Sequence, residues 1–164
     1  MMKHYQLEMY MNKNTIIKAF FVGLIASIAF IIAQPFFGMS TLTSRHAAAY
    51  MTGGYNEMVA IVLSWIVHIS VSVFYAFVAT LIFNANSSLL ASVGQVAVLG
   101  WITTMTATPA NEWVVKLVNS QSIPSFTHLS AINTDIGPKF WLHVAFFAFV
   151  VVLLWLSKAK NKLL

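Results

Sequence analysis

The fold of this chain is decided by residues 58–83, which read MVAIVLSWIVHISVSVFYAFVATLIF. The stretch carries no Asp, Glu, Lys or Arg, and it exceeds the roughly 20 residues that an α-helix needs to cross a bilayer core about 30 Å thick. The whole chain is also strongly apolar. Of its 164 residues 59% are hydrophobic and 8% are charged, and the mean hydropathy is +0.80. These values exclude a water-soluble domain and indicate an integral membrane protein.

Three more uncharged stretches have the length of a membrane span, at residues 19–37, 89–108 and 140–157. All four stretches are continuously apolar, which disfavours the alternating strands of a β-barrel. The sequence therefore predicts an all-α membrane protein whose four transmembrane helices form a bundle over residues 19–157. A tail at residues 1–18 precedes the bundle and a basic tail at residues 158–164 follows it.

Lysines cluster near the two chain ends, outside the first and last spans. They are Lys3, Lys13, Lys18, Lys158, Lys160 and Lys162, whereas the two long loops hold only Arg45, Lys116 and Lys139. Because positive residues favour the cytoplasmic side, both termini are predicted to be cytoplasmic, and an even number of spans agrees. The expected location is a bacterial cytoplasmic membrane. The net charge of +5 then reflects topology and contact with lipid headgroups, and not binding of nucleic acid.

The predicted outer loops cover residues 38–57 and 109–139. Thr108 and Pro109, followed by Glu112, are typical of a helix N-terminus. Residues 110–119 are therefore expected to form either a short helix lying on the outer leaflet or a simple ordered loop. At the other end of the chain, Met11 is as good a start as Met1, and residues 1–10 are expected to be a weakly ordered extension.

Small and weakly polar residues predict which helix faces pack together, since lipid tails give no hydrophobic drive for helix association. One stripe of such residues lies on the first helix and another on the third. At 100° per residue these stripes comprise Gly23, Ser27, Phe30 and Gln34, and Ala97, Gly100, Thr103, Thr104 and Ala107. Both faces are expected to point inward.

The strongest functional candidate is a polar stripe about 80° wide on the second helix. It comprises Ser64, His68, Ser72 and Tyr75, and Gln34 on the first helix completes the candidate intramembrane site. His68 is expected about 15 Å deep, near the bilayer midplane, where an ionisable group is costly and often functional. A proton relay, a ligand contact and a purely structural hydrogen bond all remain open for it.

Three further histidines, His46, His128 and His143, are candidates on the outer face. Interfacial anchoring beside Trp141 and Lys139 is the simpler reading of His143. A haem held by His68 and His143 is not expected, because residue counts place these side chains roughly 8 to 10 Å apart in depth. The histidines also lack the close spacing of a metal site.

Enzyme signatures are missing from the sequence. Zero cysteines exclude disulfides, thiol redox catalysis and Cys-based metal sites. The chain also has no G-x-S-x-G, Walker A, H-E-x-x-H or glycine-rich dinucleotide motif. The sequence therefore predicts no catalytic residue, no metal and no cofactor.

Several short features resemble the YagU-like family of small bacterial inner-membrane proteins. They are Phe21-Val22-Gly23-Leu24-Ile25-Ala26, then His68, Ser72 and Phe74, then Gln95 and Pro109, and finally His143. The first outer loop lacks the proline- and arginine-rich composition associated with that family. The resemblance implies a four-span inner-membrane protein connected with acid tolerance, and it implies no catalytic mechanism.

Three functions are compatible with the sequence. The first is permeation of protons or small solutes, with His68 as the titrating group and with oligomerisation completing the path. The second is a non-catalytic accessory or assembly subunit of a larger membrane complex. The third is an enzyme that acts on lipid or quinone at the outer interface, for which His143, His128, Asp135 and Glu112 have no recognisable catalytic spacing.

Overall fold

The computed structural model describes residues 13–163, with side chains described through residue 159. Over this range the chain is all-helical, and four helices are long and apolar enough to cross a membrane, as the sequence predicts. The predictions made for Met11, Lys3 and residues 1–10 lie outside the described residues. The elements in chain order are α2 (Lys13–Ala33), η1 (Gln34–Phe37), α3 (Leu42–Thr52), α4 (Glu57–Ala85), α5 (Leu89–Ser120), η2 (Phe126–His128) and α6 (Pro138–Leu163).

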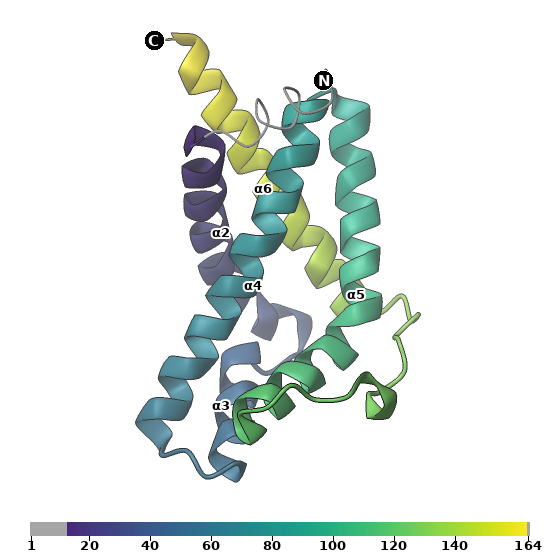
Figure 1. Cartoon of the computed structure of the whole chain (residues 1–164). Helices are drawn as coiled ribbons and strands as arrows, with labels where there is room; N and C mark the ends of the chain where they lie inside the picture. The colour runs from purple at the N-terminus through teal and green to yellow at the C-terminus, as the bar shows by residue number, and fades with distance from the viewer. Residues whose placement is uncertain (1–12, 164) are drawn as a thin grey trace, which may run out of the picture.

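The four long helices form a bundle with two distinct ends (Figure 1). The start of α2, the turn between α4 and α5, and the end of α6 lie at one end, while α3 and the second half of α5 lie at the other. Helix α2 packs mainly against α4, and α5 packs mainly against α6, whereas α4 and α5 make few direct contacts. This pairing leaves room between α4 and α5 near the α3 end.

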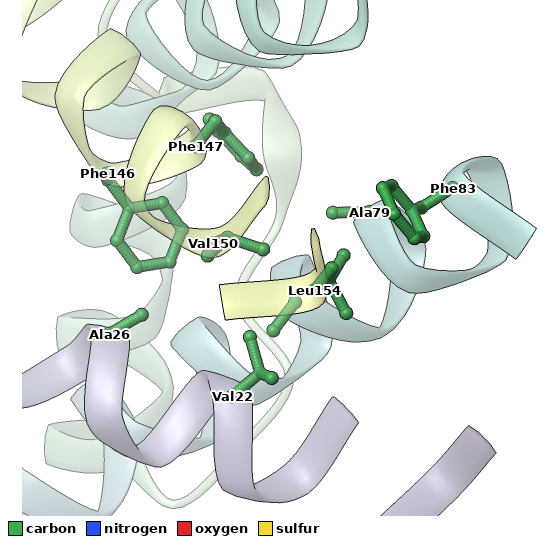
Figure 2. Close-up of a cluster of buried hydrophobic side chains, with 9 residues drawn as sticks. Val22, Ala26, Ala79, Phe83, Phe146, Phe147, Val150 and Leu154 are labelled. Atoms are coloured by element: carbon green, nitrogen blue, oxygen red, sulfur yellow. The ribbon is translucent and has the colours of Figure 1, made fainter. Parts of the chain in front are cut away.

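The core lies where α2, α4 and α6 meet (Figure 2). Alanines on α2 and α4 let the helix backbones approach, and the large side chains come mostly from α6. Close packing of this kind supplies the dispersion contacts that hold helices together in lipid. The cluster comprises Val22, Ala26, Ala76, Ala79, Phe83, Phe146, Phe147, Val150 and Leu154.

Two glycines permit close contacts between helices. A Cβ atom at Gly23 would lie 2.5 Å from the Cα atom of Val73 on α4, and one at Gly100 would lie 3.2 Å from the Cα atom of Val144 on α6. These contacts confirm the predicted inward faces around both glycines. Ala97 is an exception and is exposed. Because α5 approaches only α6 closely, its buried stripe is narrower than the sequence suggests.

The first loop contains a helix that the sequence analysis did not predict. Helix α3 begins after Thr41, whose side chain accepts a hydrogen bond from the backbone N–H of Ser44 and so caps the helix. Its buried face includes His46, Ala47 and Tyr50 and packs against α4. The predicted loop at residues 38–57 is therefore mostly a helix that covers one end of the bundle.

The predicted helix break at Thr108 and Pro109 is wrong, because α5 continues without interruption to Ser120. Residues 110–119 are helical, but they continue the third long helix and do not form a separate one. Pro109 has no N–H to donate to the carbonyl of Met105, and the backbone N–H of Asn133 donates to that carbonyl instead, at 3.0 Å. The freed acceptor is thus satisfied, and α5 bends in its second half (Figure 1).

The long second loop packs against the second half of α5. The indole Nε1 of Trp113 donates to the carbonyl of Pro124, and the Trp113 ring stacks on Phe126 with centroids 5.6 Å apart. Glu112 accepts hydrogen bonds from the backbone N–H and the hydroxyl of Ser130. These contacts attach the loop to the same end of the bundle that α3 covers.

Candidate functional site

A cavity of about 90 Å³, here called the inner cavity, lies between α4 and α5. All five α-helices contribute to its wall, which is mostly apolar with a few polar side chains. The lining comprises Phe30, Leu42, Val67, His68, Val71, Ser72, Tyr75, Thr103, Ala107, Ala110, Asn111, Val114, His143 and Phe146. A mostly apolar pocket with a few convergent polar groups is the usual form of a small-molecule site.

His68 is held in one tautomer by a backbone group of α2. Its side chain is 4% exposed, and Nε2 lies 2.9 Å from the carbonyl oxygen of Ser27. A carbonyl oxygen only accepts hydrogen bonds, so Nε2 carries the proton and donates it. Nδ1 of the neutral ring then keeps its lone pair and can accept a hydrogen bond or a proton.

His143 is held in the opposite tautomer. Its Nδ1 lies 2.9 Å from Oγ1 of Thr104, and the same hydroxyl lies 2.7 Å from the carbonyl oxygen of Gly100. The single hydroxyl proton goes to that carbonyl, which cannot itself donate, so Nδ1 of His143 must donate to Thr104. Nε2 of His143 then keeps its lone pair.

The structure corrects the interfacial reading of His143, which is 8% exposed and lines the same cavity as His68. The Phe30 ring lies between the two imidazoles, with centroids 5.7 Å from His68 and 5.8 Å from His143. Depth counted along each helix separately suggests that the two histidines are far apart. Helix α6, however, crosses the bundle diagonally (Figure 1), and His143 on it lines the same cavity as residues of α4.

The remaining predicted members of the site divide into two groups. Ser72 and Tyr75 line the inner cavity with His68. Ser64 is buried, and its hydroxyl donates to the carbonyl of Ile61 in its own helix. Gln34 is also buried, and its Oε1 accepts a 2.7 Å hydrogen bond from the backbone N–H of Leu42. Gln34 therefore holds the start of α3 and does not line the cavity.

Helix α5 contributes polar residues to the lining that sequence reasoning left out of the site. Thr103 belongs to the predicted inward face, so its helical position could have indicated it. Asn111 could not be recognised, because the predicted break at Pro109 placed it in a loop outside the bundle. The continuous helix instead brings Asn111 to the cavity wall.

A second space of about 290 Å³, here called the outer cavity, adjoins the inner cavity and shares Leu42 and Asn111 with it. Its other lining residues come from α3 and the second half of α5. They are Arg45, His46, Ala49, Glu112, Val115 and Lys116. Glu112 and Lys116 form an ion pair at 2.8 Å.

His46 is the buried polar group of the outer cavity. It is 4% exposed, and among the described residues neither ring nitrogen has a hydrogen-bond partner. Burial, the positive charge of Arg45 and repulsion from His68 when that ring is protonated together lower the pKa of His46 to about 4, and burial is the largest cause. His46 is therefore neutral at pH 7 and has both ring nitrogens unused.

His128, the third outer-face candidate, is exposed in η2 and lines neither cavity. Only its backbone carbonyl takes part in a described contact, accepting a hydrogen bond from Nζ of Lys116. The structure thus brings His46, His68 and His143 to two adjoining cavities and leaves His128 outside both.

Among residues 13–159 no three His, Cys, Asp or Glu side chains lie close enough together to hold a metal ion. Comparison of the chain with family models, curated protein sequences and solved structures finds no match. The resemblance to the YagU-like family therefore stays a prediction, and the case for a function depends on the geometry of the two cavities.

Proposed function

We propose that this protein conducts protons or small solutes across a membrane through the inner cavity, with His68 as the titrating group. The observation that carries this proposal is the pair of imidazoles in one cavity, each with one nitrogen fixed as a donor and the other left with a lone pair. Such a nitrogen can take up a proton without breaking the hydrogen bond that holds the ring.

The polar side chains around His68 support a relay. Ser72 and Tyr75 line the cavity one and two turns along α4 from His68, and Thr103 and Asn111 face the same space from α5. Their hydroxyl and amide groups can both donate and accept hydrogen bonds. A proton taken up at Nδ1 of His68 would be released to one of these groups or to water.

We place the protein in a bacterial cytoplasmic membrane with both chain ends on the cytoplasmic side. The start of α2 and the end of α6 lie at the same end of the bundle, which supports an even number of crossings (Figure 1). Lysines lie near both chain ends, and positively charged residues favour the cytoplasmic side, so we assign this end of the bundle to the cytoplasm. A contribution to acid tolerance follows from the family resemblance and is part of the same proposal.

Proton flux in proteoliposomes tests the proposed function. The informative variant is His68→Gln, because a glutamine amide can still donate to the Ser27 carbonyl but does not titrate. We expect the wild type to dissipate a pH gradient. We expect His68→Gln to dissipate the gradient at least tenfold more slowly. His128→Gln is the matched control, since His128 lies outside both cavities, and it should keep the wild-type rate.

The competing accessory-subunit function gives a different result. It expects no flux from the wild type alone, and a stoichiometric protein partner after detergent solubilisation and affinity purification. A homo-oligomer without partners that conducts protons would contradict it. A wild type that conducts no protons or solutes would refute the permeation proposal.

A further inference from the structure

The outer cavity contains one positive charge that its own side chains leave unbalanced. Glu112 and Lys116 neutralise each other in their ion pair, and His46 is neutral at pH 7. Arg45 lines the same space, and among the described residues it forms no ion pair. The net charge of the lining is therefore +1.

His46 lines this space and has a ring N–H group without a hydrogen-bond partner among the described residues. Its neutral ring has one N–H group, and leaving a buried polar group without a partner destabilises the folded protein. Its ring lies 5.8 Å from that of Tyr50, whose hydroxyl is also buried and without a described partner. A buried polar side chain without a partner at the wall of a cavity, as His46 is, indicates that a bound molecule or water completes its hydrogen bonds.

Apart from the Asn111 amide, the rest of the lining is apolar and comes from Leu42, Ala49 and Val115. A molecule that satisfies all three features has one negative charge, an oxygen that can accept a hydrogen bond and a short hydrocarbon body. The planar guanidinium of an arginine binds a carboxylate through two parallel hydrogen bonds.

We propose that the outer cavity is a binding site for small monocarboxylates. Arg45 pairs with the carboxylate, His46 donates a hydrogen bond to it, and the apolar residues contact its hydrocarbon part. This inference rests on the proposed function and names the substrate class, because the outer cavity adjoins the inner cavity at Leu42 and Asn111.

The charge of the site favours a monoanion over a phosphate dianion. A dianion would leave one excess negative charge next to the Glu112 carboxylate. Lys139 on α6 lies within electrostatic range of Arg45, but its ammonium donates a hydrogen bond to the Thr108 hydroxyl and does not line the cavity. The lining therefore offers one cation to one anion.

Binding of ¹³C-labelled propionate to the full chain in nanodiscs of zwitterionic lipid tests the proposal. We expect wild-type protein to bind propionate, and Arg45→Gln and His46→Leu each to weaken binding at least tenfold. His46→Gln should recover part of the affinity, because its amide restores a donor. Lys13→Gln removes one charge from the opposite end of the bundle and should bind like the wild type.

Inorganic phosphate and nanodiscs with anionic lipid provide the second arm. Propionate binding that depends on Arg45 and His46, with weaker phosphate binding and no competition from anionic lipid, supports a monocarboxylate site. Equal or tighter phosphate binding, loss of propionate to anionic lipid, or no propionate binding by the wild type would overturn it. Circular dichroism shows that each variant is folded, and His46→Gln covers the case in which His46→Leu does not fold.

The two proposals can fail separately. If propionate binds through Arg45 but nothing crosses the membrane through the inner cavity, the proposed function is refuted and the carboxylate site stands. If flux depends on His68 but propionate does not bind, the carboxylate site is refuted and the proposed function stands.

Discussion

Acidification should destabilise the fold through His46. The ring is buried beside Arg45, and its pKa falls from the ordinary value of 6.5 to about 4. In the unfolded chain this histidine takes up a proton as the pH falls below about 6.5, whereas in the folded protein it stays neutral until about pH 4. The free energy of unfolding is therefore unaffected by protonation of His46 above pH 6.5, and it decreases as the pH falls from 6.5 toward 4.

The magnitude follows from the two pKa values. At about 1.4 kcal/mol for each pH unit, a drop from 6.5 to about 4 corresponds to roughly 3 kcal/mol of unfolding free energy. That loss is a large part of the 5–15 kcal/mol typical of folded domains. Replacement by glutamine removes the titrating group. The free energy of unfolding of His46→Gln should therefore depend less on pH than that of the wild type between pH 6.5 and 4.

The assay is reversible unfolding in mixed micelles, followed by tryptophan fluorescence at several pH values between 7 and 4. The quantity of interest is the difference in unfolding free energy between the wild type and His46→Gln, because this difference isolates the titration of His46 together with its electrostatic coupling to His68. His128→Gln, which changes an exposed histidine, should run parallel to the wild type. A constant difference between the wild type and His46→Gln across this pH interval would refute the reasoning.

Three further substitutions probe the packing that positions the cavities. Gly23→Ala puts a methyl group 2.5 Å from the Cα atom of Val73 and should lower the free energy of unfolding by about 1–3 kcal/mol in the same assay. An unchanged free energy of unfolding would contradict the close contact. Thr104→Val removes the acceptor for Nδ1 of His143 and should also lower the free energy of unfolding by about 1–3 kcal/mol, and a wild-type ¹⁵N spectrum that shows the Nε2–H tautomer of His143 would contradict the assignment. Pro109→Ala restores an N–H that competes for the carbonyl now bound by the loop, so hydrogen exchange of that loop amide should speed up at least tenfold; unchanged exchange would show that the proline does not anchor the loop.

The membrane-spanning part of the fold could be predicted because it depends on local sequence. Uncharged stretches of sufficient length mark the four long helices, and small residues such as Gly23 and Gly100 mark where they touch. The end of the bundle that holds α3 and the second half of α5 could not be predicted in the same way. A proline that follows a threonine is typical of a helix N-terminus. Here α5 instead continues through Pro109, and the backbone N–H of Asn133, far along the chain, satisfies the carbonyl of Met105.

The candidate site is also predictable from local sequence only in part. His68, Ser72 and Tyr75 share one face of one helix, so periodicity alone groups them. His143 joins them only because α6 crosses the bundle at an angle, and His46 is buried only because the first loop folds as α3. Sequence spacing carries neither crossing angles nor the folding of loops onto helices.

The most direct test of the permeation account is the pH at which His68 takes up a proton in a bilayer. Selectively ¹⁵N-labelled histidine, assigned by comparison with His68→Gln, gives this titration by solid-state NMR. The account predicts the Nε2–H tautomer at neutral pH and a titration midpoint that coincides with the midpoint of proton flux in proteoliposomes. A His68 ring that stays neutral throughout the pH range in which the flux changes would contradict it.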